Sequence, residues 1–561
     1  MTEASLLDRV RTPDDVKSLP DGDLPGLARA LRAEIVSSVS RTGGHLASSL
    51  GTVELTLALL RAFDPVRDRV VWDVGHQAYA WKILTGRRDA FGTIRALDGL
   101  SGFCNPEESP CDAFVSGHAG SALAAAAGMV EARRLLGESG EVVAVVGDAS
   151  LANGVSLEAL GNLPSLKGRL ILVVNDNGQA GVGPRLDAAF FAGFALPCIG
   201  PVDGHDPVAL AAALSAAKAA RGNVAVHVLT VKGRGFAPAE RDPAAWHGVG
   251  PFDIRSADAA GPEAADSWSA VFGREALRLA RSDRRVCALT AAMRDGTGLS
   301  AFAAACPDRF FDSGICEEHL VTFAAGLAKC GMRPLVAIYS TFLQRAVDQV
   351  MHDVCLLNLP VVFAVDRAGC VGRDGRTHHG MFDVAMLRCL PGLTVCQPAD
   401  AGELAAMLDL ALETGGPWLV RYPRGVAEPA RTGAEPVRYG RAGQICGAEA
   451  PVQIWALGEQ VAKACAVRGL LAGRGIAAGV VNARFVKPFD AGLLARQRAE
   501  GKRIVTLENG SVAGGFGEAA GADMKFGWPD AFVGHGSVAE LEARHGLTAE
   551  AIAEAVARAL A

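Results

Sequence analysis

Two apolar runs that end in polar residues stand out in the first half of the chain. Residues 142–146 (VVAVV) lead into Asp148, and residues 170–174 (LILVV) lead into Asn177. Unbroken apolar runs of this length predict buried parallel strands, and the helical spacing of apolar residues over 151–163 predicts a crossover helix between them. Open α/β sheets bind ligands where their parallel strands end, so we expect Asp148 and Asn177 side by side at a binding site.

The residue types at this edge suit a metal ion and a phosphate. The carboxylate of Asp148 and the amide oxygen of Asn177 match Mg²⁺, which completes its octahedron with oxygens of a diphosphate. The small Ala149 and Ser150 would let the backbone approach that phosphate. The alternative interpretation is that these polar residues are ordinary turn residues after strands.

Histidines recur in loops of the same part of the chain. A strand over 70–72 leads to His76, and a strand around 113–115 leads to His118 in a glycine loop before a helix of small residues. The backbone N–H groups at such a helix start favour a phosphate. His45 lies in a glycine-flanked bend, where a histidine either caps the next helix or serves a site. We expect the three strand-end loops at His76, His118 and Asp148 to form one pocket.

Two acidic residues begin a helix in the second half. Glu317 and Glu318 precede the apolar stretch LVTFAAGLA. The helix dipole stabilises carboxylates at this position, so they need no further function. However, the apolar stretch predicts that this helix end is buried, and a buried acid is costly enough to suggest a function.

Charged residues also gather at predicted strand ends after residue 335. One strand ends at Tyr339, a second leads to Arg367, and a last one reaches Arg421 and Arg424. The glycine-rich loop between the second and the last strand adds three polar side chains: Asp374, His378, His379. This concentration of charge suits an anionic substrate better than a plain surface.

Two stretches rich in proline, glycine and small polar residues, 256–267 and 427–440, have the composition of linkers. Helical and strand patterns alternate throughout, which predicts an α/β fold of three doubly wound parallel-sheet domains. The expected domains are these: 1–255, 268–426, 438–561. Strands of the last domain are predicted at 452–456, 478–481 and 503–507.

Composition narrows the function classes. The chain has 561 residues, half of them hydrophobic, which is long enough for several cores. A net charge of −6 supplies no basic surface for nucleic acid. There is no apolar run of membrane-spanning length and no signal-peptide core, and thirteen cysteines without CxxC pairing are typical of reduced thiols. We therefore expect a soluble, cytoplasmic protein that binds neither nucleic acid nor membranes.

Several motifs occur in an order that resembles one enzyme family: GGHLASSLGTVELT, WDVGHQAY with KILTGRR, GPVDGHD, KGRGF, PDRFFD, EEHLVTFAAGLA, IYSTFLQRAVDQVMHDV, VDRAG with DGRTHHG, RYPRG and RFVKPFD. This is the 1-deoxy-D-xylulose-5-phosphate synthase family of transketolase-like thiamine-diphosphate enzymes, and the resemblance spans nearly the whole chain. It implies three α/β domains in a homodimer, with thiamine diphosphate and Mg²⁺ as cofactors. The implied reaction joins pyruvate to D-glyceraldehyde 3-phosphate with loss of CO₂, giving a precursor of isoprenoids, thiamine and pyridoxal.

The resemblance also assigns roles to individual residues. Asp148 and Asn177 match the metal ligands. Glu317 matches the glutamate that protonates the aminopyrimidine ring, and His45 and His247 match positions that pass protons near the reactive carbon. Two further catalytic positions are Arg345 and His378. The cofactor-lining positions are these: His76, Gly117, His118, Ala119, Asp148, Ala149, Ser150, Asn177, Phe236, Glu317, Phe342. The substrate contacts are these: His45, Tyr339, Arg367, Asp374, His378, Arg424.

Two departures from the family keep an alternative open. The segment between the Asn-Asp-Asn motif and GPVDGHD is much shorter than in the family, and the usual GHSSTS is here GHAGSA, with fewer hydroxyls. The alternative is a related pyruvate carboligase, or a transketolase-like ketol transferase, that uses a different aldehyde acceptor. A non-catalytic relative is disfavoured, because Glu317, His45 and His247 are all present.

Overall fold

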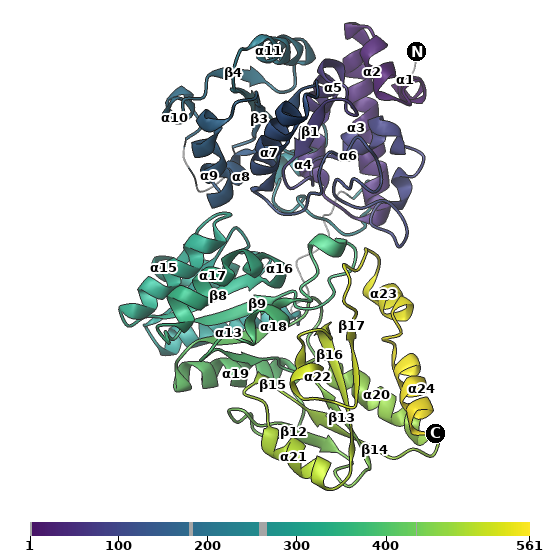
Figure 1. Cartoon of the computed structure of the whole chain (residues 1–561), viewed down its shortest axis with the longest axis vertical. Coiled ribbons are helices and arrows are strands. Elements are labelled where there is room, and N and C mark those ends of the chain that lie inside the picture. Colours follow the sequence, from purple (N-terminus) through teal and green to yellow (C-terminus); the bar gives the residue numbers. More distant parts are fainter. Residues whose placement is uncertain (1–2, 179–182, 184, 257–265, 434) are drawn as a thin grey trace. The chain divides into compact units, whose positions relative to one another are not determined.

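The chain forms two compact units, residues 1–261 and 262–561, in a computed structural model that describes residues 3–178, 183, 185–256, 266–433 and 435–561 (Figure 1). Each unit is an arrangement of helices around mainly parallel sheets. Within the described part of the chain, none of the helices combines the length and apolar character that a membrane span requires.

The first unit contains one parallel five-stranded sheet. Its strands are β1 (Arg69–Trp72), β2 (Val142–Gly147), β3 (Ile171–Asp176), β4 (Cys198–Asp203) and β5 (Val224–Leu229), in the order β1-β2-β3-β5-β4. Successive residues of β2 face different cores: Val143 and Val145 pack on one side, and Val142 and Ala144 on the other. Helices therefore cover both faces, as near-continuous apolar strands require.

The helices of the first unit are α1 (Glu3–Asp8), α2 (Pro13–Ser18), α3 (Leu24–Thr42), α4 (Leu46–Gly51), α5 (Val53–Ala62), α6 (Tyr79–Lys82), α7 (Ser121–Leu136), α8 (Asp148–Leu151), α9 (Gly154–Asn162), α10 (Ala188–Gly193), α11 (Pro207–Ala219) and α12 (Ala237–Arg241). The predicted crossover helix corresponds to α8 and α9, which connect the adjacent parallel strands β2 and β3. The predicted strand–helix–strand unit is confirmed.

The second unit contains two sheets. The first comprises β6 (Val286–Thr290), β7 (Phe310–Asp312), β8 (Arg333–Tyr339), β9 (Val362–Asp366), β10 (Thr394–Cys396), β11 (Trp418–Arg421) and β15 (Phe485–Lys487), in the order β15-β10-β11-β9-β8-β6-β7. The second comprises β12 (Gly443–Cys446), β13 (Val452–Ala456), β14 (Ala478–Asn482), β16 (Arg503–Ser511) and β17 (Met524–Trp528), in the order β12-β14-β13-β16-β17. All pairs are parallel except β10–β15 and β12–β14.

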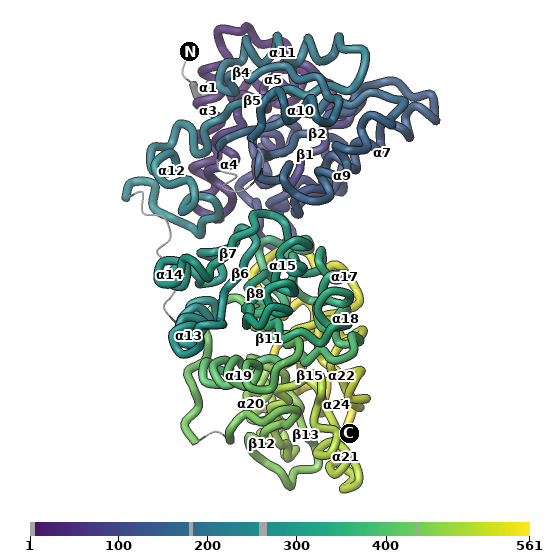
Figure 2. Tube along the Cα trace, turned by 90° about the vertical axis from the view of Figure 1, so that its left-hand side faces the viewer, coloured from purple at the N-terminus to yellow at the C-terminus, as the bar shows by residue number. Residues whose placement is uncertain are grey.

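The helices of the second unit are α13 (Trp268–Ser282), α14 (Ser300–Ala305), α15 (Glu317–Lys329), α16 (Ser340–Leu343), α17 (Val347–Gln349), α18 (Asp383–Leu387), α19 (Ala401–Thr414), α20 (Gln460–Ala472), α21 (Ala491–Ala499), α22 (Phe516–Ala519), α23 (Val538–Arg544) and α24 (Ala549–Leu560). The two sheets are closely joined, because β15 lies beyond the predicted linker yet pairs with β10, and because α18 packs against β16. Figure 2 traces the second unit from α13 to α24.

The expected α/β fold with three mainly parallel sheets is confirmed. The three-domain division stays a prediction, since by contacts the second and third sheets belong to one unit. Residues 257–265 of the first predicted linker lie outside the described residues.

The strand predicted around 113–115 is wrong. Those residues form an irregular loop in which Phe114 and Val115 are 39% and 40% exposed, and no neighbouring strand is available to pair with them. β4, which contains Pro201, was not predicted. Proline in a strand is tolerated where the strand lies at a sheet edge, as β4 does.

Candidate active site

Three predicted histidines meet in the first unit. The ring centroids of His45, His76 and His247 lie 5.7 Å (His45–His76), 5.7 Å (His45–His247) and 5.1 Å (His76–His247) apart. Their loops come together although more than 200 positions separate the first from the last. The expected pocket of the loops at His76, His118 and Asp148 stays a prediction, since the ring contacts join His76 to His45 and His247.

Backbone contacts hold these histidines in place. Gly44 forms an antiparallel bridge with Val249, and the N–H of Ala47 donates to the carbonyl of Trp246 at 3.0 Å, which fixes the loop that carries His247. Gly44 has φ +148°, and a Cβ there would lie 2.6 Å from the hydroxyl oxygen of Tyr79. Only glycine permits this close approach, and the same Tyr79 hydroxyl accepts from the N–H of His45 at 3.0 Å.

Two neighbours of the histidines were not predicted. Ser48, on α4, has its hydroxyl 3.3 Å from Nδ1 of His247. Phe103 packs its ring against His45, with centroids 5.2 Å apart. Their roles become apparent only in the fold, because each contact joins segments that lie far apart in the chain.

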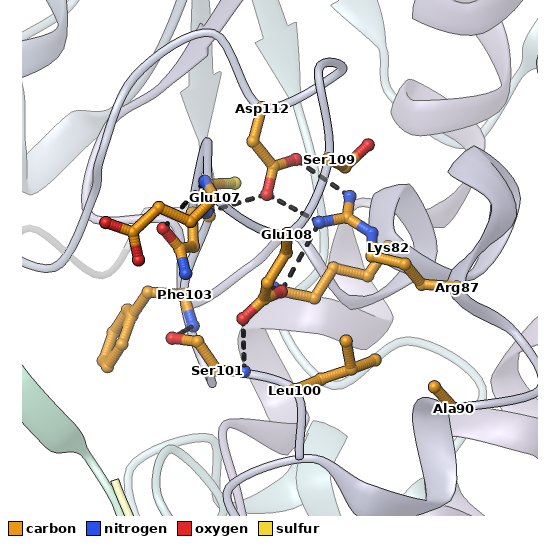
Figure 3. Close-up of polar contacts among 12 residues, drawn as sticks. Lys82, Arg87, Ala90, Leu100, Ser101, Phe103, Glu107, Glu108, Ser109 and Asp112 are labelled. Carbon is orange, nitrogen blue, oxygen red and sulfur yellow. Dashed lines mark hydrogen bonds and ion pairs between the residues drawn. The ribbon is translucent and has the colours of Figure 1, made fainter. Parts of the chain in front are cut away.

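A buried ionic cluster shapes the loop that carries Phe103 (Figure 3). Lys82, from α6, pairs with Glu108 at 2.6 Å, and Arg87 forms two bonds to the Asp112 carboxylate at 2.7 and 2.8 Å. Glu108 also accepts from the N–H of Ser101 at 2.7 Å. The two cations and two carboxylates compensate each other inside the protein, so the irregular loop 100–117 has a fixed conformation without belonging to a helix or strand.

The predicted phosphate loop at the start of α7 is anchored by an acid. The Asp73 carboxylate accepts from the N–H groups of Gly120 and Ala122 at 2.9 and 3.0 Å. The preceding Gly117 and Ala119 are buried, and His118 is half-buried. Asp73 thus uses part of the helix N-terminus, and the phosphate contact predicted for this loop stays a prediction.

Asp148 and Asn177 occupy the strand ends as expected. Asp148 begins α8, directly after β2, and is 7% exposed; Asn177 directly follows β3 and is half-buried. The two preceding polar residues are engaged inside the sheet. Asn175 accepts from the Thr230 hydroxyl at 2.6 Å, and the Asp176 carboxylate lies 2.8 Å from Nε2 of His227. Ser150 is buried and Ala149 is half-buried beside them.

Lys232 lies at this edge and was not among the predicted site residues. It follows β5 and is half-buried; burial lowers the pKa of Lys232, while the nearby Asp148 carboxylate raises it. Its loop is anchored by the N–H of Gly233, which donates to the carbonyl of Ala47 at 2.8 Å. The KGRGF motif at a strand end was the signal that could have identified it.

The donor set at this edge fits the predicted cation. Among the described residues there is no group of three or more His, Cys, Asp and Glu side chains suited to a metal. A cation at this edge would take one carboxylate from Asp148, one amide oxygen from Asn177 and further oxygens from its ligand. Mg²⁺ accepts such a set, because it is commonly held by one or two carboxylates together with phosphate oxygens.

Phe236, another predicted cofactor contact, caps α12 and packs edge-on against Trp246, with ring centroids 5.1 Å apart. Trp246 in turn precedes His247. The structure therefore connects this predicted residue to the histidine cluster through one aromatic neighbour.

In the second unit, Glu317 begins α15 and is 2% exposed, as the apolar helix predicted. Burial raises the pKa of Glu317, and the Arg345 guanidinium opposes this shift, donating from Nη1 to Oε2 at 3.0 Å. Arg345 lies in a short 3₁₀ turn, η6 (Gln344–Ala346), between the short helices α16 and α17. Glu318 is half-buried.

The predicted substrate residues form a chain of ring contacts. The Arg367 guanidinium lies over the Tyr339 ring at 4.1 Å, Tyr339 stacks on Phe342 with centroids 5.8 Å apart, and Phe342 meets the edge of His378 at 5.7 Å. Arg367 has φ +58° and is paired with Asp366 at 2.9 Å. The structure thus brings four of the predicted residues together.

Asp374 and Arg424 form a second group in the same unit. Nη1 of Arg424 lies 3.8 Å from the Asp374 carboxylate, and the Arg424 side chain is 51% exposed. Arg421, which the sequence analysis placed at the same edge, is instead fully buried and bound to Asp383 at 2.9 Å. Arg421 is the last residue of β11, but its side chain forms a buried ion pair and does not face the proposed acceptor site.

Comparison with known proteins gives matches along the chain. The N-terminal model of 1-deoxy-D-xylulose-5-phosphate synthase matches residues 7–184, the transketolase pyrimidine-binding domain matches 265–429, and the transketolase C-terminal domain matches 443–552. The chain is 44% identical to 1-deoxy-D-xylulose-5-phosphate synthase 2 of Geobacter sulfurreducens, covering 98% of both chains. It is 42% identical to 1-deoxy-D-xylulose-5-phosphate synthase of Pelotomaculum thermopropionicum, covering 98% of this chain and 96% of that one.

Among solved structures, a transketolase from Leishmania mexicana aligns at 20% identity with a TM-score of 0.48, covering 96% of this chain and 97% of that one. The alignment to the Geobacter sulfurreducens protein extends over 614 positions, more than the 561 residues of this chain. That relative therefore contains insertions that this chain lacks.

Proposed function

The chain belongs to the 1-deoxy-D-xylulose-5-phosphate synthase family, and on that premise we propose that it joins pyruvate to D-glyceraldehyde 3-phosphate, giving 1-deoxy-D-xylulose 5-phosphate and CO₂. It is a transferase of the transketolase class that depends on thiamine diphosphate and supplies isoprenoid biosynthesis. The observation that carries the proposal beyond family membership is the buried acid Glu317 at the start of α15.

Thiamine diphosphate, when bound, supplies a carbon that adds to the 2-oxo acid and accepts the electrons released by decarboxylation. The chain's own contribution is proton control. Because Arg345 donates to Oε2 of Glu317, the proton of this acid belongs on Oε1, from which it is donated to a ring nitrogen of the cofactor. Burial favours the protonated form of Glu317, which is the form that can donate.

Asp148 and Asn177 would hold Mg²⁺, and the metal would bind the diphosphate. Lys232 adds a positive charge beside Asp148 and would bind a diphosphate oxygen that the metal does not. The small side chains of Ala149 and Ser150 leave the backbone accessible to the same phosphate.

His45, His76 and His247 would face the reacting carbon atoms of pyruvate. Imidazoles both donate and accept protons near neutral pH, so a group of three can stabilise the carboxylate on binding and move a proton during ligation. Ser48 contacts Nδ1 of His247 at 3.3 Å, which holds the orientation of that ring.

The exposed guanidinium of Arg424, with Arg367 and His378, would bind the phosphorylated aldehyde. A planar guanidinium donates two parallel N–H groups to a phosphate, and Asp374 orients Arg424 from the other side. Tyr339 and Arg367 lie in contact and would form one wall of the acceptor site.

The proposed assembly is a homodimer in the cytoplasm. Four large apolar side chains on or beside α15 and η7 (Val350–Cys355) are exposed, and a second copy of the chain would cover them: Phe323, Met351, Leu356, Leu357. All thirteen cysteines lie in the described residues and no two form a disulfide, which suits a reducing compartment. Light scattering on the purified protein tests the dimer, with a Leu356→Asp, Leu357→Asp variant expected to be monomeric.

The decisive experiment incubates the purified chain with thiamine diphosphate, Mg²⁺ and pyruvate, and with either glyceraldehyde 3-phosphate or unphosphorylated glyceraldehyde. We expect ligation of the phosphorylated acceptor, identified by mass spectrometry. Arg424→Ala should raise the KM for that acceptor by roughly ten- to a hundred-fold through loss of charge-assisted hydrogen bonds, while pyruvate decarboxylation changes little. Arg558→Ala, on α24, is the control. A wild type without preference for the phosphorylated acceptor would establish the alternative carboligase instead.

A further inference from the structure

We propose that the C-terminal part of the chain positions the acceptor site, with His379 and Asn509 as the positioning residues. The element that they fix is the loop 368–382, which carries Asp374 and His378 and contains only one short turn, η8 (Gly375–Thr377). The inference rests on the proposed function, because His379 and Asn509 would position the loop that carries the proposed acceptor contacts Asp374 and His378. It concerns the second unit alone.

The loop is bound along its length to the segment 509–538. Near its end, the carbonyl of Met381 accepts from the N–H of Ser511 at 2.8 Å. In its middle, Gly375 has φ +72°, and a Cβ there would lie 2.9 Å from Cβ of His535. At its start, a Cβ on Gly369 would lie 2.8 Å from Nδ2 of Asn509. These distances leave no room for a side chain at either glycine, so the loop packs tightly against the C-terminal segment.

His379 connects the loop to the C-terminal segment through hydrogen bonds. It is buried, its Nδ1 accepts from the N–H of Val371 at 3.1 Å, and its Nε2 lies 2.9 Å from the carbonyl of Gly534. Nδ1 therefore has no proton and Nε2 donates. Burial lowers the pKa of His379, so this neutral form is the one present at neutral pH. One side chain thus fixes the loop internally and ties it to the C-terminal segment.

Asn509 connects the same loop to a buried polar network. Its amide oxygen accepts from Nη1 of Arg421, and its amide nitrogen donates to Glu459 at 2.6 Å. Gln397 makes the equivalent pair of contacts, so two amides bridge the buried Arg421 and the half-buried carboxylate of Glu459. Such a network in the interior holds its members firmly, because each hydrogen bond is strengthened by the low local dielectric.

Arg421 extends the network to the proposed acceptor wall. Nε of Arg421 donates to the Asp383 carboxylate, which also accepts from the Ser340 hydroxyl at 3.0 Å. Ser340 directly follows Tyr339, and Asp383 directly follows the loop. The C-terminal sheet therefore reaches both sides of the acceptor site through hydrogen bonds, and displacement of either anchor moves residues that would contact the aldehyde.

The test compares His379→Ala and Asn509→Ala with His379→Gln, in which the amide can restore the hydrogen bond to Gly534. Gln497→Ala is the matched control, since Gln497 is an equally buried amide of the C-terminal part that bonds Trp455 instead. The alanine variants should raise the KM for glyceraldehyde 3-phosphate about tenfold through misplacement of the loop, with the KM for pyruvate changed less than about twofold. His379→Gln should recover most of the loss.

Hydrogen exchange of the amide of Val371 provides a readout that does not need activity. It should accelerate in His379→Ala, because the acceptor on Nδ1 is lost, and remain slow in Gln497→Ala. Faster exchange together with a raised acceptor KM supports the inference. Faster exchange with an unchanged acceptor KM overturns it while the proposed function stands. A wild type that does not ligate the phosphorylated aldehyde overturns the proposed function, and the acceptor role of the loop with it.

Discussion

At the scale of single residues, Glu317 is the acid whose surroundings fit its proposed task. Burial raises its pKa, and Arg345 is its nearest cation. We predict that Glu317→Gln retains the fold and most of the cofactor binding but loses turnover by at least about a hundredfold, because the amide cannot transfer a proton. Steady-state kinetics and calorimetric binding of thiamine diphosphate measure the two effects separately.

Glu318→Gln is the matched control, since it changes the adjacent acid of the same helix turn. Its activity should stay within about threefold of the wild type, as expected for a residue that is not part of the proton path. Equal loss of activity in the two variants would mean that the wrong acid or the wrong site has been chosen.

Lys232 makes the second prediction at this scale. Lys232→Met keeps the length of the side chain but removes the charge beside Asp148, so affinity for thiamine diphosphate at fixed Mg²⁺ should fall about tenfold or more through loss of a charge-assisted hydrogen bond. Calorimetry measures the affinity directly. Arg234→Ala, an exposed cation in the same loop, should leave it unchanged. If both variants bind equally well, Lys232 has no role at the diphosphate.

The residue scale also shows what the sequence could predict. Asp148, Asn177 and Glu317 were recognisable because each stands directly after a strand or at the start of a helix, which fixes its place from local pattern alone. Phe103 and Ser48 were not, because their partners His45 and His247 are brought to them by loops whose course depends on tertiary contacts.

At the scale of elements, the loop 100–117 illustrates a fold feature without a sequence signature. Its conformation depends on Lys82, Arg87, Glu108 and Asp112, which lie on separate segments and pair only in the folded chain. The short apolar stretch within it suggested a strand, but the pairing of Asp112 with Arg87 and the glycine that follows prevent one. Periodicity is informative for central strands and weak for edge strands such as β4, β7 and β15.

The loop leads to a prediction about Phe103. Phe103→Leu keeps an apolar side chain in the core but removes the flat ring from His45, so kcat should fall by up to about tenfold, the equivalent of one aromatic contact. Cofactor affinity should be unchanged. Phe63→Leu, an equally buried phenylalanine of the same unit, is the control for a general packing defect. A loss of kcat that is the same in both variants would contradict a specific role of the ring.

Glu508, on β16, makes the free energy of unfolding depend on pH, because its buried carboxyl group binds the start of α22. Glu508 accepts from the N–H groups of Phe516 and Gly517 at 2.8 Å each, yet burial raises the pKa of Glu508 to about 7. Above its ordinary pKa of about 4.3 the unfolded chain has lost this proton while the folded chain keeps it. The free energy of unfolding should therefore fall by about 1.4 kcal/mol per pH unit as pH rises toward 7.

Urea unfolding at pH 5.5 and 6.5 measures this slope. Glu508→Gln cannot ionise and should be less pH-dependent than the wild type by that amount, although it is less stable overall because its amide NH₂ faces a backbone N–H. Glu550→Gln, at an exposed position on α24, should have the wild-type slope. An unchanged slope in Glu508→Gln would place the proton on another group.

At the scale of the whole molecule, composition predicted two linkers and therefore three domains, whereas the contacts define two units. The stretch 427–440 does not separate two independent units. The chain that follows it returns to the second sheet, where β15 pairs with β10. Such a return cannot be predicted from composition, because β15 has only three residues and its partner lies almost ninety positions earlier. The second and third sheets are consequently expected to unfold together.

Glu403 tests this expectation. It lies on α19, which packs on the second sheet, and it binds Asn482, which ends β14 of the third sheet, and Arg484 just beyond it. Its carboxylate accepts from Nε of Arg484 at 2.8 Å and from the amide of Asn482 at 2.8 and 2.9 Å, and all three side chains are buried. Glu403→Ala leaves Arg484 without its carboxylate, which costs about 3–5 kcal/mol. Calorimetry should show the transition of residues 262–561 moving to lower temperature as a single event, with that of residues 1–261 unchanged. Glu413→Ala, exposed on the same helix, should have no such effect. Separate transitions for the two sheets would instead make the third sheet an independent domain.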